Sequence, residues 1–470
     1  MATHPTMSSS ESEEPEFNFQ EAFEETKDVP CRVHDVTVEG NKRTKSHVIA
    51  RELERLRGAT TLDELKDELL VASANLRALS IFRNIDIVAD AGPDDLEGTA
   101  DIAVTLEEKG VWGLSTGTYL QGNEGSVEAS VRAQNLFGTA EVMQGNASLG
   151  SQSSNVYSWS YTQPRVAGTY TEGEWRLFQN TRCLQKHSSH TELNRGTKVV
   201  FSQGRHELSY ELAWRRLYDP SQLASREVRK MLGDGVKSSV GYKWEVDARD
   251  NAWRPTRGAL LRWSTEVAGV GLDPMLTRFL KNVVQAQVAI PIAEGVDITL
   301  DAKAGLLLPW GSAAGTNVAD RFYMGGPSSV RGFRTRSVGP ADERRVRKDD
   351  QGEAGSLKYD YLGGDVMCTA KAAVNFDIPQ KVARALGVHG HVFANAGNLA
   401  PLNAGAFGSW GGFESALADF VSTFRCSVGA GVVFPTRIGR LEINYCHVLS
   451  AEPTDRTKRG VQVGFSTIDL

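Results

Sequence analysis

From about residue 110 to the C-terminus, the chain alternates between apolar and polar positions in segments of roughly ten residues, with turn residues between them. In the segment "LLRWSTEV", Leu261, Trp263 and Val267 would face one side of an extended strand. Arg262 and Glu266 would face the other side. About sixteen such segments can be counted, and alternating segments of this length are typical of transmembrane barrel strands. The pattern therefore predicts a transmembrane β-barrel over residues 109–470.

A soluble β-sandwich is the alternative fold, because its strands also carry one apolar face and one polar face. About sixteen consecutive strands without a helical layer are too many for one sandwich, whereas a barrel in lipid has a polar lumen and no open edge. We therefore expect a membrane all-β fold, an antiparallel barrel of about 16 strands.

Residues 31–108 have a helical period and predict a small α+β domain with the order β-α-α-β-β. The clearest element is the second helix, where Thr61 and Glu64 form a capping box. The apolar residues that follow recur at steps of three and four, as expected for a helix with one buried face: Leu62, Leu65, Leu69, Ala72, Leu76 and Leu79. Alternating strands before and after the helices would form the sheet on which that face packs.

The first 30 residues predict a disordered acidic tail. Residues 1–28 contain eight Asp or Glu against Lys27 alone, which is a net charge of -7, while the whole chain has a net charge of -6. Such a segment has too few apolar groups to offset its ordering entropy. It also lacks the basic, apolar or Arg-rich features of a cleaved targeting signal, so we expect the protein to start in the cytosol.

Enzymatic sites are weakly supported by the sequence. The five cysteines, Cys31, Cys183, Cys368, Cys426 and Cys446, include no C-x-x-C pair, so we expect free thiols. The best metal candidate is Cys183 with His187 and His190, but no fourth ligand lies in an evident motif. No G-x-S-x-G elbow occurs. We expect no catalytic residues, no metal, no cofactor and no nucleic-acid partner.

The loop sequence "FYMGGPSSVRGFRTRSVGP", residues 322–340, is neither strand nor helix by pattern. A phosphate-binding loop would need G-x-x-x-x-G-K-[ST] before a helix, and that motif is absent here. An ordinary flexible surface loop and a loop that folds back onto the protein both remain possible from composition alone.

Several motifs together resemble the family of outer-membrane assembly proteins that join POTRA domains to a barrel. These are "DARDNAWRPTRG" at 247–258, Val330-Arg331-Gly332-Phe333, "GGD" at 363–365, "FANAGN" at 393–398 and the final "GVQVGFSTIDL". The resemblance covers residues 31–470 and implies that residues 31–108 are a POTRA domain.

The resemblance also implies that residues 322–362 fold inward and that Arg331 anchors them to the barrel wall. Bacterial members carry acidic residues where this chain has Asn375 and Asn395, so we expect polar rather than ionic contacts from Arg331 to these two amides. Gly332 would let the loop backbone pass close to the wall, and Phe333 would fill the space beside it.

The expected activity is the insertion of β-barrel precursors by strand pairing at a lateral gate between the first and last barrel strands. The gate candidates are Gly113 and Gly117 on one side and Gln462 and Gly464 on the other. These glycines would weaken the seam, although ordinary barrel curvature would also explain them. The last strand matches the family's polar-x-Gly-x-x-hydrophobic-x-hydrophobic signal at Gln462 and Gly464, but not at Thr467 and Asp469.

A single POTRA module and an acidic start are similar to the family's mitochondrial member, the core barrel of the sorting and assembly machinery. This resemblance implies a mitochondrial outer-membrane location with the POTRA domain in the intermembrane space. The implied partners are unfolded barrel precursors, accessory subunits of an assembly complex and the lipid bilayer. A protein-translocating channel of the plastid outer envelope is the alternative.

Overall fold

The computed structural model describes residues 27–466, apart from residues 122–123, 152–153, 272–275, 312–314, 346–357, 403–409 and 437–438. The chain divides into two units, one of Met1–Val111 with Gln134–Glu141 and one of Trp112–Ala133 with Val142–Leu470. The predicted acidic tail lies, up to residue 26, outside the described residues, and so do Thr467 and Asp469 of the closing segment.

The first unit has the predicted β-α-α-β-β order. Its elements are β1 (Arg32–Glu39), α2 (Ser46–Leu53), the 3-10 helix η1 (Glu54–Gly58), α3 (Leu62–Ala78), β2 (Phe82–Ala91) and β3 (Thr99–Glu108). The sheet order is β1-β3-β2, with β1 parallel to β3 and β2 antiparallel to it. Leu65 and Leu76 of α3 pack with Ile102 of β3 in one apolar core. The helical period in the sequence therefore identified the buried face of α3.

The helix α3 begins at the predicted cap. The Glu64 backbone N–H donates to Thr61 Oγ1 at 3.3 Å. The Glu64 carboxylate accepts hydrogen bonds from the backbone N–H and hydroxyl of Thr60, at 2.9 and 2.6 Å, rather than from the cap residue itself. Hydrogen bonds therefore run in both directions across the first turn, as in a capping box. The difference is that the Glu64 carboxylate binds Thr60, the residue before the N-cap, instead of the N-cap residue Thr61.

The hairpin turn Gln134–Glu141 connects two barrel strands but belongs to the first unit. The sequence did not predict this assignment. The side-chain amide of Asn135 donates to Thr44 Oγ1 at 2.8 Å, and the Thr44 hydroxyl donates to Glu108 Oε1 at 2.6 Å. Ala140 of the turn is fully buried in the apolar core of this unit. The turn is therefore part of the packing of the first unit and not a free connection.

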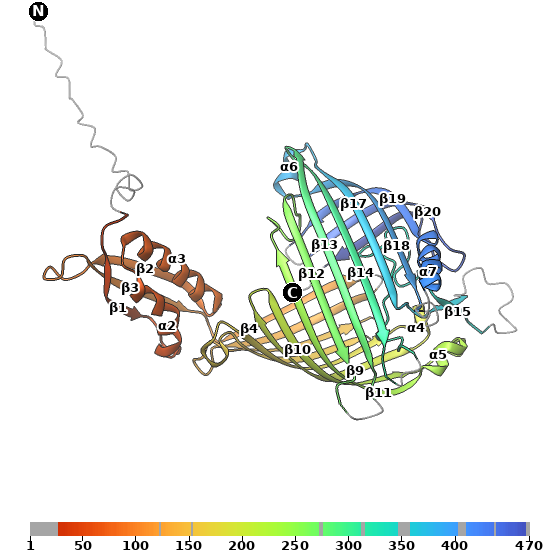
Figure 1. Ribbon diagram of the computed structural model, residues 1–470, viewed down its shortest axis with the longest axis horizontal. Helices are drawn as coiled ribbons and strands as arrows, with labels where there is room; N and C mark the ends of the chain where they lie inside the picture. Colours follow the sequence, from red (N-terminus) through yellow and green to blue (C-terminus); the bar gives the residue numbers. More distant parts are fainter. Residues whose placement is uncertain are drawn as a thin grey trace, which may run out of the picture. The chain divides into compact units, whose positions relative to one another are not determined.

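The second unit is a 16-stranded antiparallel sheet that forms a barrel (Figure 1). Its strands are β4 (Trp112–Gln121), β5 (Glu124–Gln134), β6 (Val142–Gly150), β7 (Asn155–Gln163), β8 (Glu172–Cys183), β9 (Thr191–Gln203), β10 (His206–Tyr218), β11 (Gly233–Asp247), β12 (Gly258–Ala268), β13 (Phe279–Ala293), β14 (Val296–Pro309), β17 (Val366–Asp377), β18 (His389–Ala400), β19 (Arg425–Pro435), β20 (Arg440–Ser450) and β21 (Gly460–Ser466). The order runs from β21 to β4 without a crossover. The predicted fold class and strand number are confirmed.

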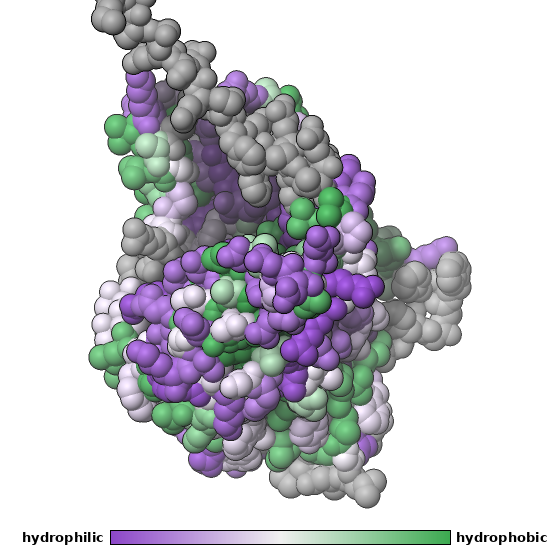
Figure 2. Space-filling view, turned by 90° about the vertical axis from the view of Figure 1, so that its left-hand side faces the viewer, coloured by the Kyte–Doolittle hydropathy of each residue, from purple (hydrophilic) through white to green (hydrophobic). Residues whose placement is uncertain are grey.

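The alternation of the barrel strands places apolar side chains outside and charged ones inside. Leu261 and Trp263 of β12 are 40% and 42% exposed. Arg262, which lies between them, points to the other face and forms an ion pair with Glu245 of β11 at 3.0 Å. Figure 2 shows hydrophobic and hydrophilic residues side by side on one face of the molecule's surface. None of the described helices has both the length and the apolar composition needed to cross a membrane.

Short elements connect the strands at the loops: η2 (Val166–Gly168), α4 (Gln185–Ser188), α5 (Arg226–Lys230), β15 (Ala341–Glu343), β16 (Tyr359–Tyr361), α6 (Lys381–Ala385) and α7 (Trp410–Ser422). Asp360 of β16 is fully buried and joins several of these loops. It accepts hydrogen bonds from the Ser189 hydroxyl at 2.6 Å, from the Ser225 backbone N–H at 2.9 Å and from Arg344 Nε at 2.7 Å. One carboxylate therefore ties the β15–β16 hairpin to the β8–β9 and β10–β11 loops.

Candidate functional site

The loop between β14 and β17 lies against the inner wall of the barrel through residues 322–340, called the anchor loop below. Its apolar side chains Met324, Val330, Phe333 and Val338 are buried together with Leu399 of β18 and Val448 of β20. Phe333 and Val330 have no exposed surface. The loop is therefore packed like a core element, and the hypothesis of a flexible surface loop is wrong.

Arg331 is the polar centre of the anchor loop. Its Nε and Nη2 atoms donate to Glu442 Oε2 of β20, at 3.2 and 2.8 Å, and its guanidinium lies 4.6 Å from the centre of the Phe393 ring. Both side chains of the ion pair are 9% exposed. Glu442 also accepts from Arg440 Nη2 at 2.7 Å and from the side-chain amide of Asn444 at 3.0 Å. The expectation that this loop contact is polar rather than ionic is wrong, because a buried carboxylate on a later strand, Glu442, supplies the counter-charge.

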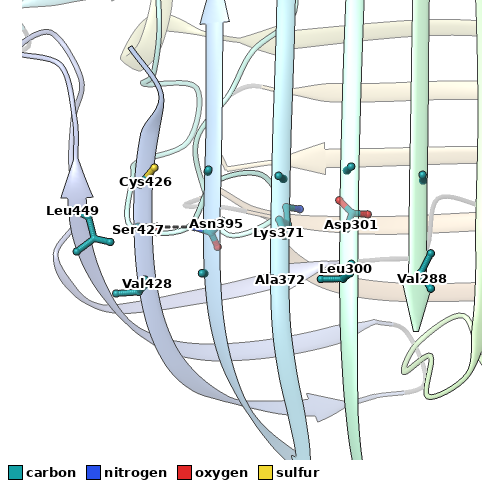
Figure 3. A pocket seen from close by; sticks show the side chains of 15 residues that line it. Val288, Leu300, Asp301, Lys371, Ala372, Asn395, Cys426, Ser427, Val428 and Leu449 are labelled. Atoms are coloured by element: carbon teal, nitrogen blue, oxygen red, sulfur yellow. Dashed lines mark hydrogen bonds between the residues drawn. The ribbon is translucent and has the colours of Figure 1, made fainter. Parts of the chain in front are cut away.

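Asn395 and Ser427 hold the backbone of the arginine rather than its side chain. The Asn395 side-chain amide donates to the Arg331 carbonyl at 3.4 Å, and the Ser427 hydroxyl donates to the same carbonyl. Figure 3 shows Asn395 of β18 and Ser427 of β19 pointing toward one another, and their hydrogen bond measures 2.6 Å. The prediction that Arg331 contacts the strand carrying Asn395 thus holds through the main chain.

Asn375 does not take part in this contact. Its side-chain amide donates to Asp297 Oδ2 at 2.6 Å and to Thr299. The register explains the error, because Asn395 is opposite Lys371 on β17, and Asn375 lies four residues further along the same strand. Four residues of strand span about 13 Å, which places Asn375 beyond the reach of the loop.

Gly332 brings the anchor loop into close contact with the wall. Its φ of +85° lies in the left-handed region, and a Cβ at this position would be 3.0 Å from Val448 Cγ2 and 3.2 Å from Ser427 Cβ. A larger residue would therefore meet both a strained backbone and a packed wall. The sequence-based role of Gly332 agrees with this geometry.

The anchor loop also contacts the closing strand β21. The Gly332 backbone N–H donates to Gln462 Oε1 at 3.0 Å, and Gln462 Nε2 donates to the Phe333 carbonyl at 2.9 Å. A Cβ added at Gly464 would lie 2.3 Å from Pro327 Cβ. The two gate candidates on β21 thus face the loop inside the barrel.

The two gate candidates on β4 have a different surrounding. A Cβ at Gly117 would meet no atom within 4 Å, and one at Gly113 would meet only Arg132 Cβ, at 3.9 Å. β4 and β21 stand at the two ends of the sheet order, and some of their Cα atoms approach within 8 Å. Among the described residues, no register of paired strand residues joins them. Over the residues that the structure describes, the seam therefore lacks the ladder that joins the other pairs of neighbouring strands in the order.

Sequence reasoning missed Glu442 and Ser427. Glu442 stands between apolar neighbours in the alternating segment "LEINY", so its inward direction was readable from the pattern. The sequence did not identify Arg331 as the partner of Glu442, because the two residues of the ion pair are 111 positions apart in the chain.

The candidate metal ligands do not form a cluster. The described residues contain no group of three or more His, Cys, Asp or Glu side chains that could hold a metal ion. His190 is buried, with Nδ1 at 2.7 Å from the Ser188 carbonyl. Burial, together with the positive charge of Arg336, lowers the pKa of His187 to about 4. This histidine is therefore neutral near pH 7.

A cavity of about 610 Å³ lies along β13, β14, β17, β18, β19 and β20 (Figure 3). Its lining includes Ala286, Ala302, Ala370 and Ala396, which are opposite one another in register across four strands and share one face. Lys371 and Asn395 also line it, but their polar atoms bond to the anchor loop at Ser328 and Arg331. The cavity is therefore on the outer, apolar face and is separate from the anchor.

Three comparisons with known proteins agree with this geometry. Residues 135–468 match the model of the Omp85 superfamily domain. The chain is 32% identical over 458 residues to the sorting and assembly machinery component 50 homolog of Xenopus tropicalis. The aligned region covers 95% of this chain and 91% of that protein. It is 29% identical over 463 residues to a SAM50-like protein of Schizosaccharomyces pombe, covering 95% and 92%.

Among solved structures, BamA from Haemophilus ducreyi lacking POTRA domains 1–3 has the same fold, with a TM-score of 0.72 and 17% identity over 93% of this chain and 85% of that one. CdiB from Acinetobacter baumannii matches with a TM-score of 0.52 and 13% identity, covering 93% and 73%. The chain belongs to the Omp85 superfamily and, within it, to the family of the sorting and assembly machinery component 50 homologues.

Proposed function

We propose that the chain is an insertase that folds β-barrel precursors and inserts them into the mitochondrial outer membrane. Its barrel lies in an outer membrane, and the names of its relatives associate it with sorting and assembly. The observation that carries the proposal is the seam, where β4 and β21 come close without a described ladder. Unpaired strand edges offer backbone donors and acceptors to an incoming strand.

The physical requirement for such a seam comes from the membrane. Each unpaired backbone group costs several kcal/mol in hydrocarbon, so a precursor strand needs a partner edge before it enters lipid. Precursors are the substrate in this proposal, accessory subunits of an outer-membrane assembly complex are the partners, and the domain of residues 31–108 lies in the intermembrane space. The proposal includes no enzymatic step and no cofactor.

Cysteine crosslinking of the seam tests the proposal. After the five native cysteines are replaced, one cysteine is placed in Trp112–Gln121 and one in Gly460–Ser466, and a disulfide is formed by oxidation. Oxidation should stop precursor insertion and leave the barrel folded. The matched control joins Tyr445→Cys to Val461→Cys, two positions already paired between β20 and β21.

Insertion that continues with a fully crosslinked seam would contradict lateral insertion. It would favour passage of the precursor through the lumen, as in a translocating channel of the plastid outer envelope. Depletion of the protein separates these functions further, because loss of an insertase should impair outer-membrane barrels while import of soluble proteins continues.

A further inference from the structure

The helix α7 lies in the loop between β18 and β19, at the same end of the barrel as α4 and β15 (Figure 1). Its last turn is joined to the barrel by Asn398 of β18, which is 1% exposed. The side-chain amide of Asn398 donates to the Phe420 carbonyl and, at 2.8 Å, to Thr423 Oγ1. Arg425 Nη1 donates to Asn398 Oδ1 and to the Thr423 carbonyl. The C-terminal end of the helix is therefore fixed to the barrel wall.

The attachment point Asn398 lies on the outer side of that wall. Ala394 and Ala396 of the same strand line the cavity on the outer face, and side chains two residues apart on a strand share a face. Leu399, which follows Asn398, faces inward and packs with Val330 of the anchor loop. The helix is thus attached next to the apolar face of the barrel, at the end where β18 runs into its loop.

The helix has an apolar stripe that the barrel leaves exposed. Leu417 and Val421 are 51% and 60% exposed, and side chains four residues apart are neighbours on a helix surface. Ser415 and Asp419 occupy the opposite side of the helix and are exposed as well. The helix is therefore amphipathic, with its apolar side chains directed neither into a core nor into the barrel wall.

The charge of the helix restricts what can cover this stripe. The sequence of α7, WGGFESALADFVS, contains no Lys or Arg, and its charged residues are Glu414 and Asp419. Amphipathic helices that bind anionic lipid carry Lys or Arg on the polar face, so attraction to anionic headgroups does not act here. Burial of apolar surface is the driving force that remains. The outer wall beside the helix faces the acyl chains, which are the nearest apolar medium for Leu417 and Val421.

We propose that α7 is an interfacial helix that lies in the headgroup layer of the membrane, on the loop side of the barrel. Leu417 and Val421 face the acyl chains, and Ser415 and Asp419 face water. The partner is a lipid surface without net charge, bound by apolar burial alone. Through Asn398, the helix holds the rim between β18 and β19 at a fixed depth in the bilayer. This role does not depend on the insertion of precursors.

A polarity-sensitive probe on α7 tests the proposal in the full-length protein. After the five native cysteines are replaced, nitrobenzoxadiazole is attached at Leu417→Cys, and the protein is reconstituted alone in phosphatidylcholine vesicles. The matched control carries the same probe at Ser415→Cys, on the opposite side of the helix. The emission of the Leu417 probe should be shifted to the blue and should resist quenching by iodide in the water, whereas the Ser415 probe should be quenched. Circular dichroism checks that both variants keep the barrel.

Nitroxide-labelled lipids measure the depth of the probe. An interfacial helix buries its apolar face about 5–10 Å into the boundary between headgroups and acyl chains. A nitroxide at the carbonyl end of the acyl chain should therefore quench the Leu417 probe more strongly than one near the chain end, and neither should quench the Ser415 probe as strongly.

Three results would overturn the proposal. The first is equal quenching by iodide at both positions, which would place the helix in water. The second is shielding of the Leu417 probe only after an outer-membrane detergent extract is added during reconstitution, which would make the stripe a surface for a protein partner. The third is lipid quenching that requires phosphatidylserine in the vesicles. Because no precursor is present, failure of the proposed insertion activity would leave these measurements unaffected.

Discussion

Removal of either partner of the buried Arg331–Glu442 ion pair should destabilise the barrel, and the two losses should differ in size. Breaking a buried pair by deleting one partner costs about 3–5 kcal/mol, because the other charge is left without compensation. In Arg331→Ala, Glu442 keeps Arg440 at 2.7 Å and Asn444 at 3.0 Å, so we expect a loss near the lower end, about 3 kcal/mol.

Among the described residues, Glu442→Ala leaves both Arg331 and Arg440 without a carboxylate partner, and Arg331 keeps the face of the Phe393 ring. We therefore expect the larger loss, about 5 kcal/mol, for this variant. Arg331→Lys should be intermediate, since an ammonium cannot reproduce the planar fork that places two donors on one carboxylate oxygen.

Urea unfolding of the purified protein in phosphatidylcholine vesicles, followed by tryptophan fluorescence, measures these free energies. The double variant Arg331→Ala with Glu442→Ala should cost less than the sum of the single losses, by about 2 kcal/mol, because the two residues are in direct contact. Additivity within about 0.5 kcal/mol, or a smaller loss for Glu442→Ala than for Arg331→Ala, would refute the reasoning.

Three further predictions concern other parts of the chain. Thr61→Ala should cost about 1 kcal/mol of stability by circular dichroism melting, since it removes the N-cap acceptor of α3, and Thr61→Ser should be close to wild type. Burial raises the pKa of Glu108, but hydrogen bonds from Thr44 and Arg43 outweigh it and lower the pKa below 4.5. The stability that Glu108 contributes should therefore be present above pH 4.5 and lost as the pH falls below it, and unfolding of Glu108→Gln should lack this component. Asp360→Ala should free the β15–β16 hairpin, which limited proteolysis would detect as faster cleavage near residues 341–361; unchanged cleavage would contradict the joining role.

The sequence by itself determined the fold, because the face of a strand on which each side chain lies, and the number of strands, depend on local properties of the chain. The period of two along "LLRWSTEV" decides which side chains face lipid, and the cap at Thr61 decides where α3 begins. Gly332 belongs to the same group of features, since a glycine in a tight loop indicates a close backbone approach wherever that loop lies.

The tertiary structure alone decided which residues meet. Glu442 rather than Asn375 reaches Arg331, because the register of β17 against β18 moves Asn375 four residues away and the fold brings β20 to the loop. The turn Gln134–Glu141 likewise packs with the first unit because the fold brings it to residues far away in the sequence, such as Thr44 beside Asn135. A single strand carries its alternation but not its register against distant partners, so contacts between residues more than a hundred positions apart appear only when the barrel is closed around the loop.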